Sequence, residues 1–404
     1  MPGRLGAGRA GFLAALFLGA LALRPQVVGI GPLLPSIQAD LGVSHAVAGL
    51  LATLVVLCMG VFAPPAPYLS SRLGSRLALT IALALIGGFG VVRLLPSDAV
   101  FVILLTIPVG IGSGLGNALM PVAAKEHFAD RPAFATGVYA TGINIGSALA
   151  AALAVPLASL FGGWRASLLV FSVVTLGLVV VWLVQTRDDE PHVRGEEPPP
   201  RLPWRSRTAW ALVACFGLLG LAYYGLNSWL PDAYIERGWG DDAAGALLAV
   251  YNVAGLLGGL VVTGVADRIG SRRFWICAWS ALMALGMVGV ILLAGGAWGW
   301  MVVMGLANGA LFALLMTLPL DVADEPSQVG AVAGMMLGVG YCLAALAPLA
   351  LGAVRDATGS YVTALWAVGG AIALLFMVSL LLTPERLRRG VPSALVAAGG
   401  PRAG

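Results

Sequence analysis

Long apolar runs separated by short polar breaks dominate the sequence. Each run has about 20 residues, the length that an α-helix needs to cross a hydrocarbon core of roughly 30 Å. Apolar and polar positions do not alternate, so the pattern does not fit the strands of an outer-membrane barrel. We therefore predict an all-α membrane protein with twelve transmembrane helices, at residues 10–37, 46–68, 77–95, 99–121, 134–158, 164–185, 209–231, 243–266, 274–294, 297–319, 330–353 and 361–383.

The composition agrees with this pattern. The chain has 404 residues, of which 59% are hydrophobic and 10% charged, whereas soluble domains have about 45–50% and about 25%. The four cysteines lie in predicted spans without the close spacing of a metal or redox site, and the histidines show no metal-ligand spacing. We expect no metal, no cofactor and no enzymatic activity.

Arginines set the expected orientation. Placing both termini in the cytoplasm puts most of them there and leaves Arg93, Arg165, Arg237 and Arg355 near the outer face. The net charge of +4 follows from this bias and implies no nucleic-acid partner. Arg4 and Arg9 before an apolar run resemble a signal peptide. We expect no cleavage, because apolar sequence continues to Ile37.

A charged, proline-containing stretch at residues 186–208 divides six spans from six. Shifting the first half by 196 positions matches Leu34-Pro35 to Leu230-Pro231 and Gly74-Ser75-Arg76 to Gly270-Ser271-Arg272. Such a register indicates parallel repeats around a site near the bilayer midplane. We predict two pseudo-symmetric six-helix bundles: an N-terminal bundle at 1–185, a cytoplasmic linker at 186–208, a C-terminal bundle at 209–383 and a cytoplasmic tail at 384–404.

The loop after the second span resembles the signature loop of the major facilitator superfamily, and so does its repeat. In each loop a glycine permits a tight turn and arginines hold carbonyl ends or carboxylates of neighbouring helices. Ser71 stands where the family usually has an acid. The expected gating residues are Arg72, Gly74, Arg76, Asp267, Arg268, Gly270 and Arg272.

Over nearly its whole length the chain resembles the cyanate/nitroimidazole transporter (CynX/NimT) family. The stretches that carry this resemblance include Leu23-Arg24-Pro25, the run from Gly31 to Gln38, and Trp229-Leu230-Pro231. The resemblance implies a transporter of small solutes, with cyanate import or nitroimidazole export among known roles. It does not determine the substrate.

Arg24 is the most informative residue of the sequence. It lies about thirteen residues from either end of the first predicted span, roughly 20 Å at 1.5 Å per residue, which is too far for its side chain to reach water. An Arg at a helix centre costs about 2.5–3.5 kcal/mol. Pro25 removes a backbone donor, so we expect a kink at the same depth. Either an anion binds Arg24, or carbonyls of neighbouring helices satisfy it in a structural role.

Other polar side chains at a similar depth are candidates to complete a substrate site. Each is also explained by a hydrogen bond between helices. Asn117 is expected closer to the cytoplasm. Trp229 either stacks on a solute or anchors at the interface. Arg93 is expected to reach the interface, or alternatively to guide anions inward. The expected substrate-binding residues are Arg24, Asn144, Tyr223, Tyr224, Asn227, Tyr251, Asn252, Asn308 and Tyr341.

The sequence therefore predicts a secondary active transporter of a small anion or polar solute, acting as a monomer by alternating access in a bacterial cytoplasmic membrane. A drug efflux antiporter of the same fold is the first alternative, but the fifth span lacks the Gly-Pro-x-x-Gly-Gly run of such proteins. A non-transporting sensor is the second, and it would need an output domain. Since no mid-span carboxylate is present, any proton dependence is expected from the substrate or from Asp232, Glu236 or Asp267.

Overall fold

The computed structural model describes residues 7–95, 98–128, 132–187, 202–265, 272–322 and 326–382. The first half contains α1 (Ala7–Ala22), α2 (Pro25–Val28), the 3₁₀ turn η1 (Gly31–Leu33), α3 (Leu34–Leu41), α4 (His45–Phe62), α5 (Ala66–Val92), α6 (Ala99–His127), α7 (Pro132–Phe161) and α8 (Trp164–Gln185). The second half contains α9 (Arg207–Ile235), α10 (Asp241–Val265), α11 (Arg272–Leu292), the 3₁₀ turn η2 (Ala294–Gly296), α12 (Ala297–Val322), α13 (Pro326–Ala344), α14 (Leu346–Thr358) and α15 (Tyr361–Leu380).

Twelve helical segments of the described chain are long and apolar enough to cross a membrane. Two of them are broken. The first, Arg9–Leu41, joins α1, α2, η1 and α3, and the eleventh, Ala331–Thr358, joins α13 and α14. The predicted number of spans and the all-helical class are thus confirmed.

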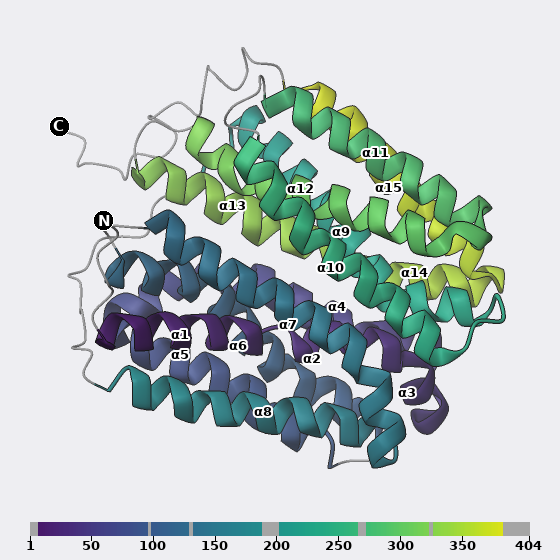
Figure 1. The fold of residues 1–404 in the computed structure, drawn as a ribbon, viewed down its shortest axis with the longest axis horizontal. Helices are drawn as coiled ribbons and strands as arrows, with labels where there is room; N and C mark the ends of the chain where they lie inside the picture. Colours follow the sequence, from purple (N-terminus) through teal and green to yellow (C-terminus); the bar gives the residue numbers. More distant parts are fainter. Residues whose placement is uncertain are drawn as a thin grey trace, which may run out of the picture.

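The helices form two bundles that lie side by side. In Figure 1 α1 to α8 make up the lower bundle and α9 to α15 the upper one. Because the number of spans is even, α1 begins and α15 ends on the same side, which we call the terminal end. The other side, where α3 and the start of α15 lie, is the opposite end. The predicted pair of six-helix bundles is therefore the fold that the chain adopts.

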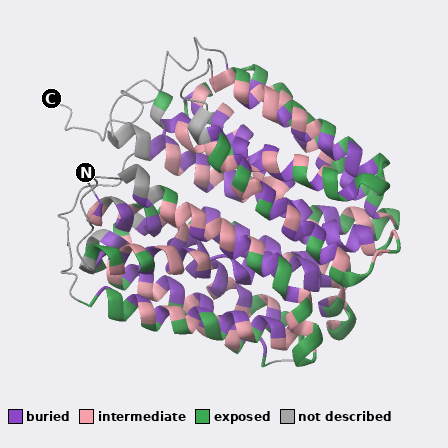
Figure 2. Ribbon diagram, in the orientation of Figure 1, coloured by how far each residue is buried: buried purple, intermediate pink, exposed green. Residues whose placement is uncertain are grey.

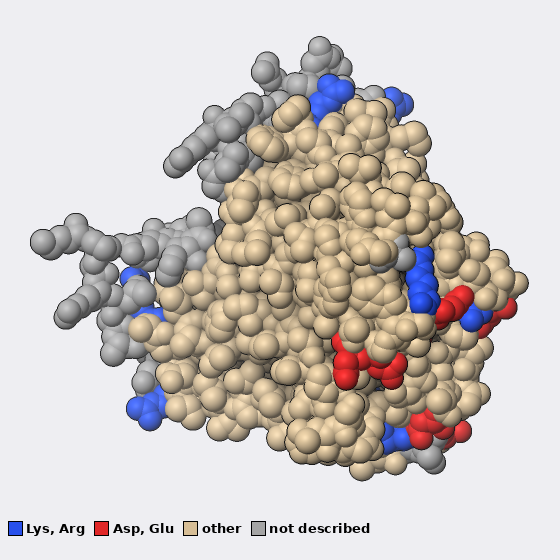
Figure 3. Space-filling model, turned by 45° about the vertical axis from the view of Figure 1, so that its right-hand side comes forward, with Lys and Arg blue, Asp and Glu red and all other residues tan. Residues whose placement is uncertain are grey.

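The surface is that of a protein surrounded by lipid. Exposed residues lie on the outward faces of the helices and buried ones lie inside the bundles (Figure 2). Many large apolar side chains are exposed, among them Leu160, Val180 and Phe274. Figure 3 shows charged side chains gathered toward the two ends of the molecule, with a broad uncharged surface between them. This distribution matches a hydrocarbon belt bounded by two polar interfaces.

Small residues bring the bundles into contact along a joint formed by α4 with α13 and α14, by α7 with α10, and by η1 with α9. A Cβ atom on Gly49 would lie 2.6 Å from the carbonyl oxygen of Pro348, and one on Gly352 would lie 2.6 Å from that of His45. The backbone N–H of Leu349 donates to Thr53 across the joint at 3.2 Å. Close approach of backbones through small residues is typical of membrane helix packing.

Prolines account for both broken spans. Pro25 has no backbone N–H and its ring crowds the carbonyl of Leu21, so α1 ends at Ala22 and α2 begins at Pro25. The predicted kink beside Arg24 is present. In the eleventh span, Pro348 stands four residues after Ala344, the last residue of α13. Leu23 and Arg24 at the first break and Ala345 at the second are buried, which shields their backbone from lipid.

Some predicted boundaries were wrong. Helix α9 continues to Ile235 instead of ending at residue 231, so Asp232 lies inside the helix rather than beyond it. Helix α5 begins at Ala66, and the predicted loop survives only as a break at Gly74, whose φ of 77° is in the left-handed region. Residues 188–201 of the predicted linker and the predicted tail at 384–404 lie outside the described residues.

Candidate functional site

Arg24 lies where the first span is broken and faces the second bundle. Only 6% of the residue is exposed. One terminal nitrogen donates to the hydroxyl of Tyr224 at 3.2 Å, and the other is 3.5 Å from the amide oxygen of Asn117. Nε has no hydrogen-bond partner among the described residues. Both partners are neutral, so the guanidinium keeps its full charge and at least one free donor.

Aromatic side chains surround this guanidinium on the side of the second bundle. The rings of Tyr223 and Tyr224 meet edge to face at 5.1 Å, and Tyr341 lies 6.4 Å from Tyr224. Phe216 packs against Tyr341 at 5.1 Å. Tyr223 and Tyr341 also interact electrostatically with Arg24. The arrangement is a cation beside aromatic walls, which suits a flat, electron-rich solute.

A chain of amides supports the tyrosines. The hydroxyl of Tyr223 donates to Asn252 at 3.0 Å, and the amide nitrogen of Asn252 donates to Asn227 at 3.1 Å. Asn227 in turn donates to the backbone carbonyl of Tyr223 at 2.8 Å. These bonds join α9 to α10 and fix the orientation of the Tyr223 ring.

The remaining predicted substrate-binding residues do not all lie close to Arg24. The ring of Tyr251 is tilted against that of Tyr223, with 6.1 Å between the ring centroids, and its buried hydroxyl has no partner among the described residues. Asn144 donates to the carbonyl of Ala140 in its own helix. Asn308 is buried with its amide oxygen unpaired in the described part of the chain. No described contact joins Asn144 or Asn308 to Arg24.

Two residues that contact Arg24 or Tyr224 were not among the predicted substrate-binding residues. Asn117 was expected too close to the cytoplasm, yet the break in the first span brings Arg24 to it. Met59 of α4 accepts from the hydroxyl of Tyr224 at 3.8 Å. Nothing in the apolar run around Met59 distinguishes it from a packing residue. Asn117 was recognisable as a polar residue within a span, and only its depth was misjudged.

Arg93 was predicted to reach the membrane interface, but it does not. It is 1% exposed and points into the first bundle, where it donates to Gln26 at 2.5 Å and to Thr106 at 3.2 Å. Gln26 donates to Ser172 at 2.8 Å and to the carbonyl of Leu168 at 3.1 Å. Since Gln26 lies in α2, two residues after Arg24, this network holds the broken segment against α5, α6 and α8.

Gln26→Leu is expected to loosen α2 and thereby displace Arg24. The change leaves Arg93 buried without its main acceptor, and an unsatisfied buried group costs about 1–3 kcal/mol. We expect a lower unfolding temperature together with a raised KM for the transported solute and a smaller change in maximal rate. Ser280→Ala, which removes a buried hydroxyl from α11, is the control. A lower stability with an unchanged KM would show that the network is structural only.

Trp229 neither lines the candidate site nor anchors at an interface. It is 2% exposed, and its indole N–H donates to the carbonyl of Pro348 at 2.7 Å. This carbonyl lies in the first turn of α14, directly after the break in the eleventh span. This predicted role was therefore wrong, and the residue connects α9 to α14.

The predicted gating residues lie at the terminal end, as far as they are described. Arg76 donates to the side chain of Thr186 and to the carbonyl of Leu183, both at 3.2 Å, so it caps the end of α8. Arg272 pairs with Asp321 at 2.6 Å and donates to Thr317 at 2.9 Å. Arg72 lies over the ring of Tyr68. Asp267, Arg268 and Gly270 are outside the described residues.

The family model of the Major Facilitator Superfamily matches residues 11–345 of the chain. The chain belongs to this superfamily. The match covers the first bundle and the second bundle up to the end of α13, and so includes the broken first span.

Individual relatives show a more specific similarity within this superfamily. The chain is 32% identical to a 2-nitroimidazole transporter of Escherichia coli (strain K12) over 92% of this chain and 94% of the relative. It is 30% identical to the cyanate transport protein CynX of the same organism over 86% of this chain and 91% of the relative. An uncharacterised transporter of Bacillus subtilis (strain 168) is 30% identical over 85% of this chain and 86% of the relative. The resemblance to the CynX/NimT family is thus confirmed.

A solved structure supports the fold independently. A bacterial homologue of the human lysosomal transporter Spinster, crystallised in an inward-facing and unoccupied conformation, superposes with a TM-score of 0.76 over 98% of this chain and all of that chain. The identity is 16%. At that level the likeness concerns the arrangement of helices and not the solute.

Proposed function

We propose that this protein is a secondary active transporter that moves a small anion or polar solute across the bacterial cytoplasmic membrane by alternating access, with Arg24 as the residue that binds the solute. A cyanate-like anion and a nitroimidazole-like compound are the proposed solute classes. The protein acts as a monomer, with the terminal end in the cytoplasm.

This proposal rests on the burial of Arg24 and on the neutral character of its hydrogen-bond partners. A buried guanidinium is costly in a membrane protein unless water or a partner compensates its charge. In the described chain its contacts are phenols and an amide, with no carboxylate. A solute anion would supply the missing charge and accept two parallel hydrogen bonds from the planar fork.

The surroundings of Arg24 support the same class of solute. Tyr224 and Tyr341 present flat apolar surfaces beside the cation, and Arg24 and Tyr224 come from opposite bundles. A solute held between them would contact both bundles, and such a contact is what links binding to rocking of the bundles. Two relatives are transporters of cyanate and of 2-nitroimidazole, small solutes that present negatively charged or partially negative atoms to a cation.

A thermal-unfolding screen of the purified protein tests the proposal. A ligand that binds only the folded protein stabilises it by RT ln(1 + [L]/Kd), about 2.7 kcal/mol at 100 times Kd. Cyanate and 2-nitroimidazole should raise the unfolding temperature, whereas imidazole without the nitro group and guanidinium should not. Counterflow uptake of the stabilising compound into proteoliposomes then separates a transporter from a sensor. Stabilisation by cations alone would contradict an anion site.

A further inference from the structure

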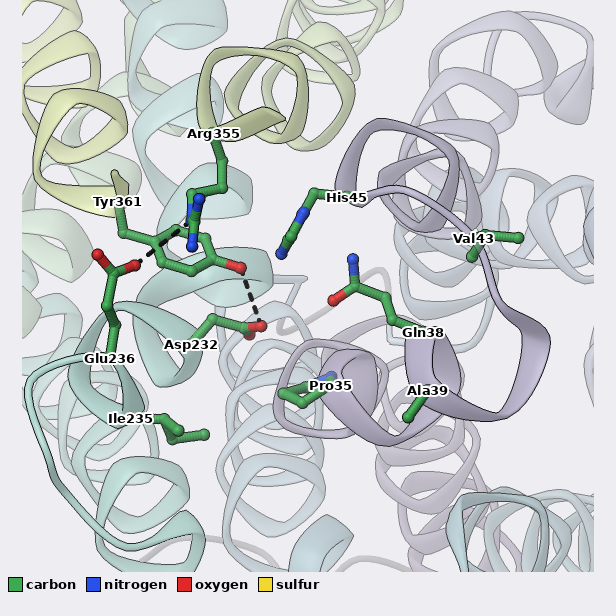
Figure 4. Close-up of a pocket in the computed structure, with 10 residues that line it drawn as sticks. All are labelled: Pro35, Gln38, Ala39, Val43, His45, Asp232, Ile235, Glu236, Arg355 and Tyr361. Atoms are coloured by element: carbon green, nitrogen blue, oxygen red, sulfur yellow. Dashed lines mark hydrogen bonds and ion pairs between the residues drawn. The ribbon is translucent and has the colours of Figure 1, made fainter. Parts of the chain in front are cut away.

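A second polar site lies at the opposite end of the joint, separate from Arg24. A cavity of about 550 Å³ opens there between the two bundles. Its polar lining comes from Gln38 and His45 of the first bundle and from Asp232, Glu236, Arg355 and Tyr361 of the second. Figure 4 shows the carboxylate of Asp232, the imidazole of His45 and the amide of Gln38 facing this cavity from its two sides.

Most charges around the cavity have partners of opposite sign. Glu236 lies 3.4 Å from Nε of Arg355, an ion pair without the geometry of a hydrogen bond. Asp356 accepts from the ring of His45 at 2.7 Å and from the backbone N–H groups of His45 and Ala46 at 3.3 and 2.9 Å. Asp356 of α14 therefore caps the N-terminus of α4 across the joint, where the helix dipole favours a negative charge.

Asp232 is the exception. It is 6% exposed, and among the described residues Tyr361 is the one side chain that donates to its carboxylate, from the hydroxyl to Oδ1 at 3.2 Å. Oδ2 is buried and has no partner among the described residues. An ionised carboxylate that loses water and gains one neutral donor is strongly disfavoured.

The internal repeat shows that Asp232 is an addition to the common scaffold. Glu236 corresponds to Asp40 at the offset of 196, and Asp40 pairs with Arg165 as Glu236 pairs with Arg355. Both halves thus have the same kind of acid–arginine pair at this end. Asp232 corresponds to Ser36. The scaffold does not need a carboxylate at this position, so its presence calls for another explanation.

We propose that Asp232 is a proton-binding site that links the external proton concentration to closure of the outer side of the transporter. The inference rests on the alternating access proposed above but not on the role of Arg24. When the bundles meet at this end, Asp232 is dehydrated, and a proton on Oδ2 removes its charge. When they separate, water reaches the carboxylate and stabilises the ionised form.

The direction of the effect follows from linkage. The closed state binds the proton more tightly than the open state, so acid on the outside favours the closed state, by reciprocity between the two equilibria. Asp241 on α10 adds negative charge near Asp232, and Glu236, directly after α9, is a second acid of the same cavity. Arg355 on α14 opposes protonation of Asp232, but its charge is shared with Glu236.

His45 on α4 would act in the same direction as Asp232. Its protonation strengthens the contact with Asp356 and so also favours closure. Tyr361 on α15 and Gln38 on α3 are neutral hydrogen-bonding groups of the same cavity. A decisive experiment must therefore distinguish the contribution of Asp232 to the pH response from that of His45.

Distances between two spin labels at the opposite end provide the test. In a variant without the native cysteines, Leu160→Cys at the end of α7 and Leu293→Cys after α11 carry the labels; both residues are well exposed. Double electron–electron resonance is recorded between pH 5 and pH 8 without solute. We expect the ratio of closed to open populations to rise about fivefold or more toward pH 5.

Substitutions assign the response to one residue. Asp232→Asn mimics the protonated side chain and should remain closed at every pH, and Asp232→Ser, the residue of the repeat, is the second variant if the first does not fold. Glu236→Gln and His45→Gln are the matched controls and should keep most of the response. Loss of the response in His45→Gln, its persistence in Asp232→Asn, or a response to sodium ions at constant pH in place of one to protons would overturn the proposal.

The same labels distinguish this inference from the proposed function. A saturating solute at constant pH should change the distances through its own site. If it does so while pH has no effect, only the proton site is wrong. If pH shifts the populations while no anion or nitro compound does, the proton site stands and the proposed solute class fails.

Discussion

Arg24→Gln is expected to weaken binding and transport of an anionic solute strongly while the purified protein stays folded. The guanidinium offers the proposed anion its only positive charge among the described contacts of the site. Hydrogen bonds to charged groups contribute about 1.5–3 kcal/mol, so affinity should fall roughly 10- to 150-fold. Removing a charge from the centre of a span also makes membrane insertion easier.

Arg24→Lys separates charge from geometry. Lysine keeps the charge but loses the planar fork, and we expect an intermediate loss of affinity, about tenfold. Dissociation constants from thermal unfolding and uptake into proteoliposomes measure both variants. Arg205→Gln, which removes an exposed arginine near the terminal end, is the control. Normal transport by Arg24→Gln would exclude an anion site, and misfolding of both variants would assign Arg24 a structural role.

Gly31→Ala is expected to prevent the bundles from closing at the opposite end. Gly31 lies in η1, and a Cβ atom there would overlap the backbone carbonyl of Asn227 in α9. A helix backbone cannot move aside as a flexible side chain can. Overpacking of this kind costs roughly 1–3 kcal/mol, which shifts a two-state equilibrium about 5- to 150-fold. Transport should fall accordingly.

The fold of each bundle should survive this change, because the clash lies between the bundles and not inside one. Gly88→Ala is the matched control, since a Cβ atom at Gly88 meets nothing within 4 Å. The spin labels at positions 160 and 293 should show a larger open population in Gly31→Ala at every pH. Transport at the normal rate would mean that this contact is not part of the transport cycle.

The number of spans and the two-bundle fold could be predicted from the amino-acid sequence alone. The thickness of the hydrocarbon core sets the length of an apolar run, and in lipid every backbone group must be satisfied within helices. The constant offset of 196 positions revealed the repeat. Arg24 and Pro25 were recognisable because depth along a single helix is a one-dimensional property.

Contacts between helices could not be predicted from the sequence. Tyr224 is 200 positions from Arg24 and Asn117 is 93 positions away, and which residues meet depends on how each helix is rotated and broken. Asn144 donates to a carbonyl of its own helix instead of the site, and Trp229 donates to the carbonyl of Pro348 in α14. A polar residue at a suitable depth is thus a necessary feature of the site but not a sufficient one.

Arg93 and Asp232 show most clearly why the surroundings of a charged side chain could not be predicted from the sequence. From the sequence, both lie near the end of a span, where a long or charged side chain normally reaches water. The tertiary structure instead offers Gln26 and Thr106 to Arg93 inside the first bundle. It also extends α9 and closes the joint over Asp232. Whether a charged group faces water, a partner or neither is decided by the packing of segments that are distant in the chain, and that packing alone created the buried carboxylate at the joint.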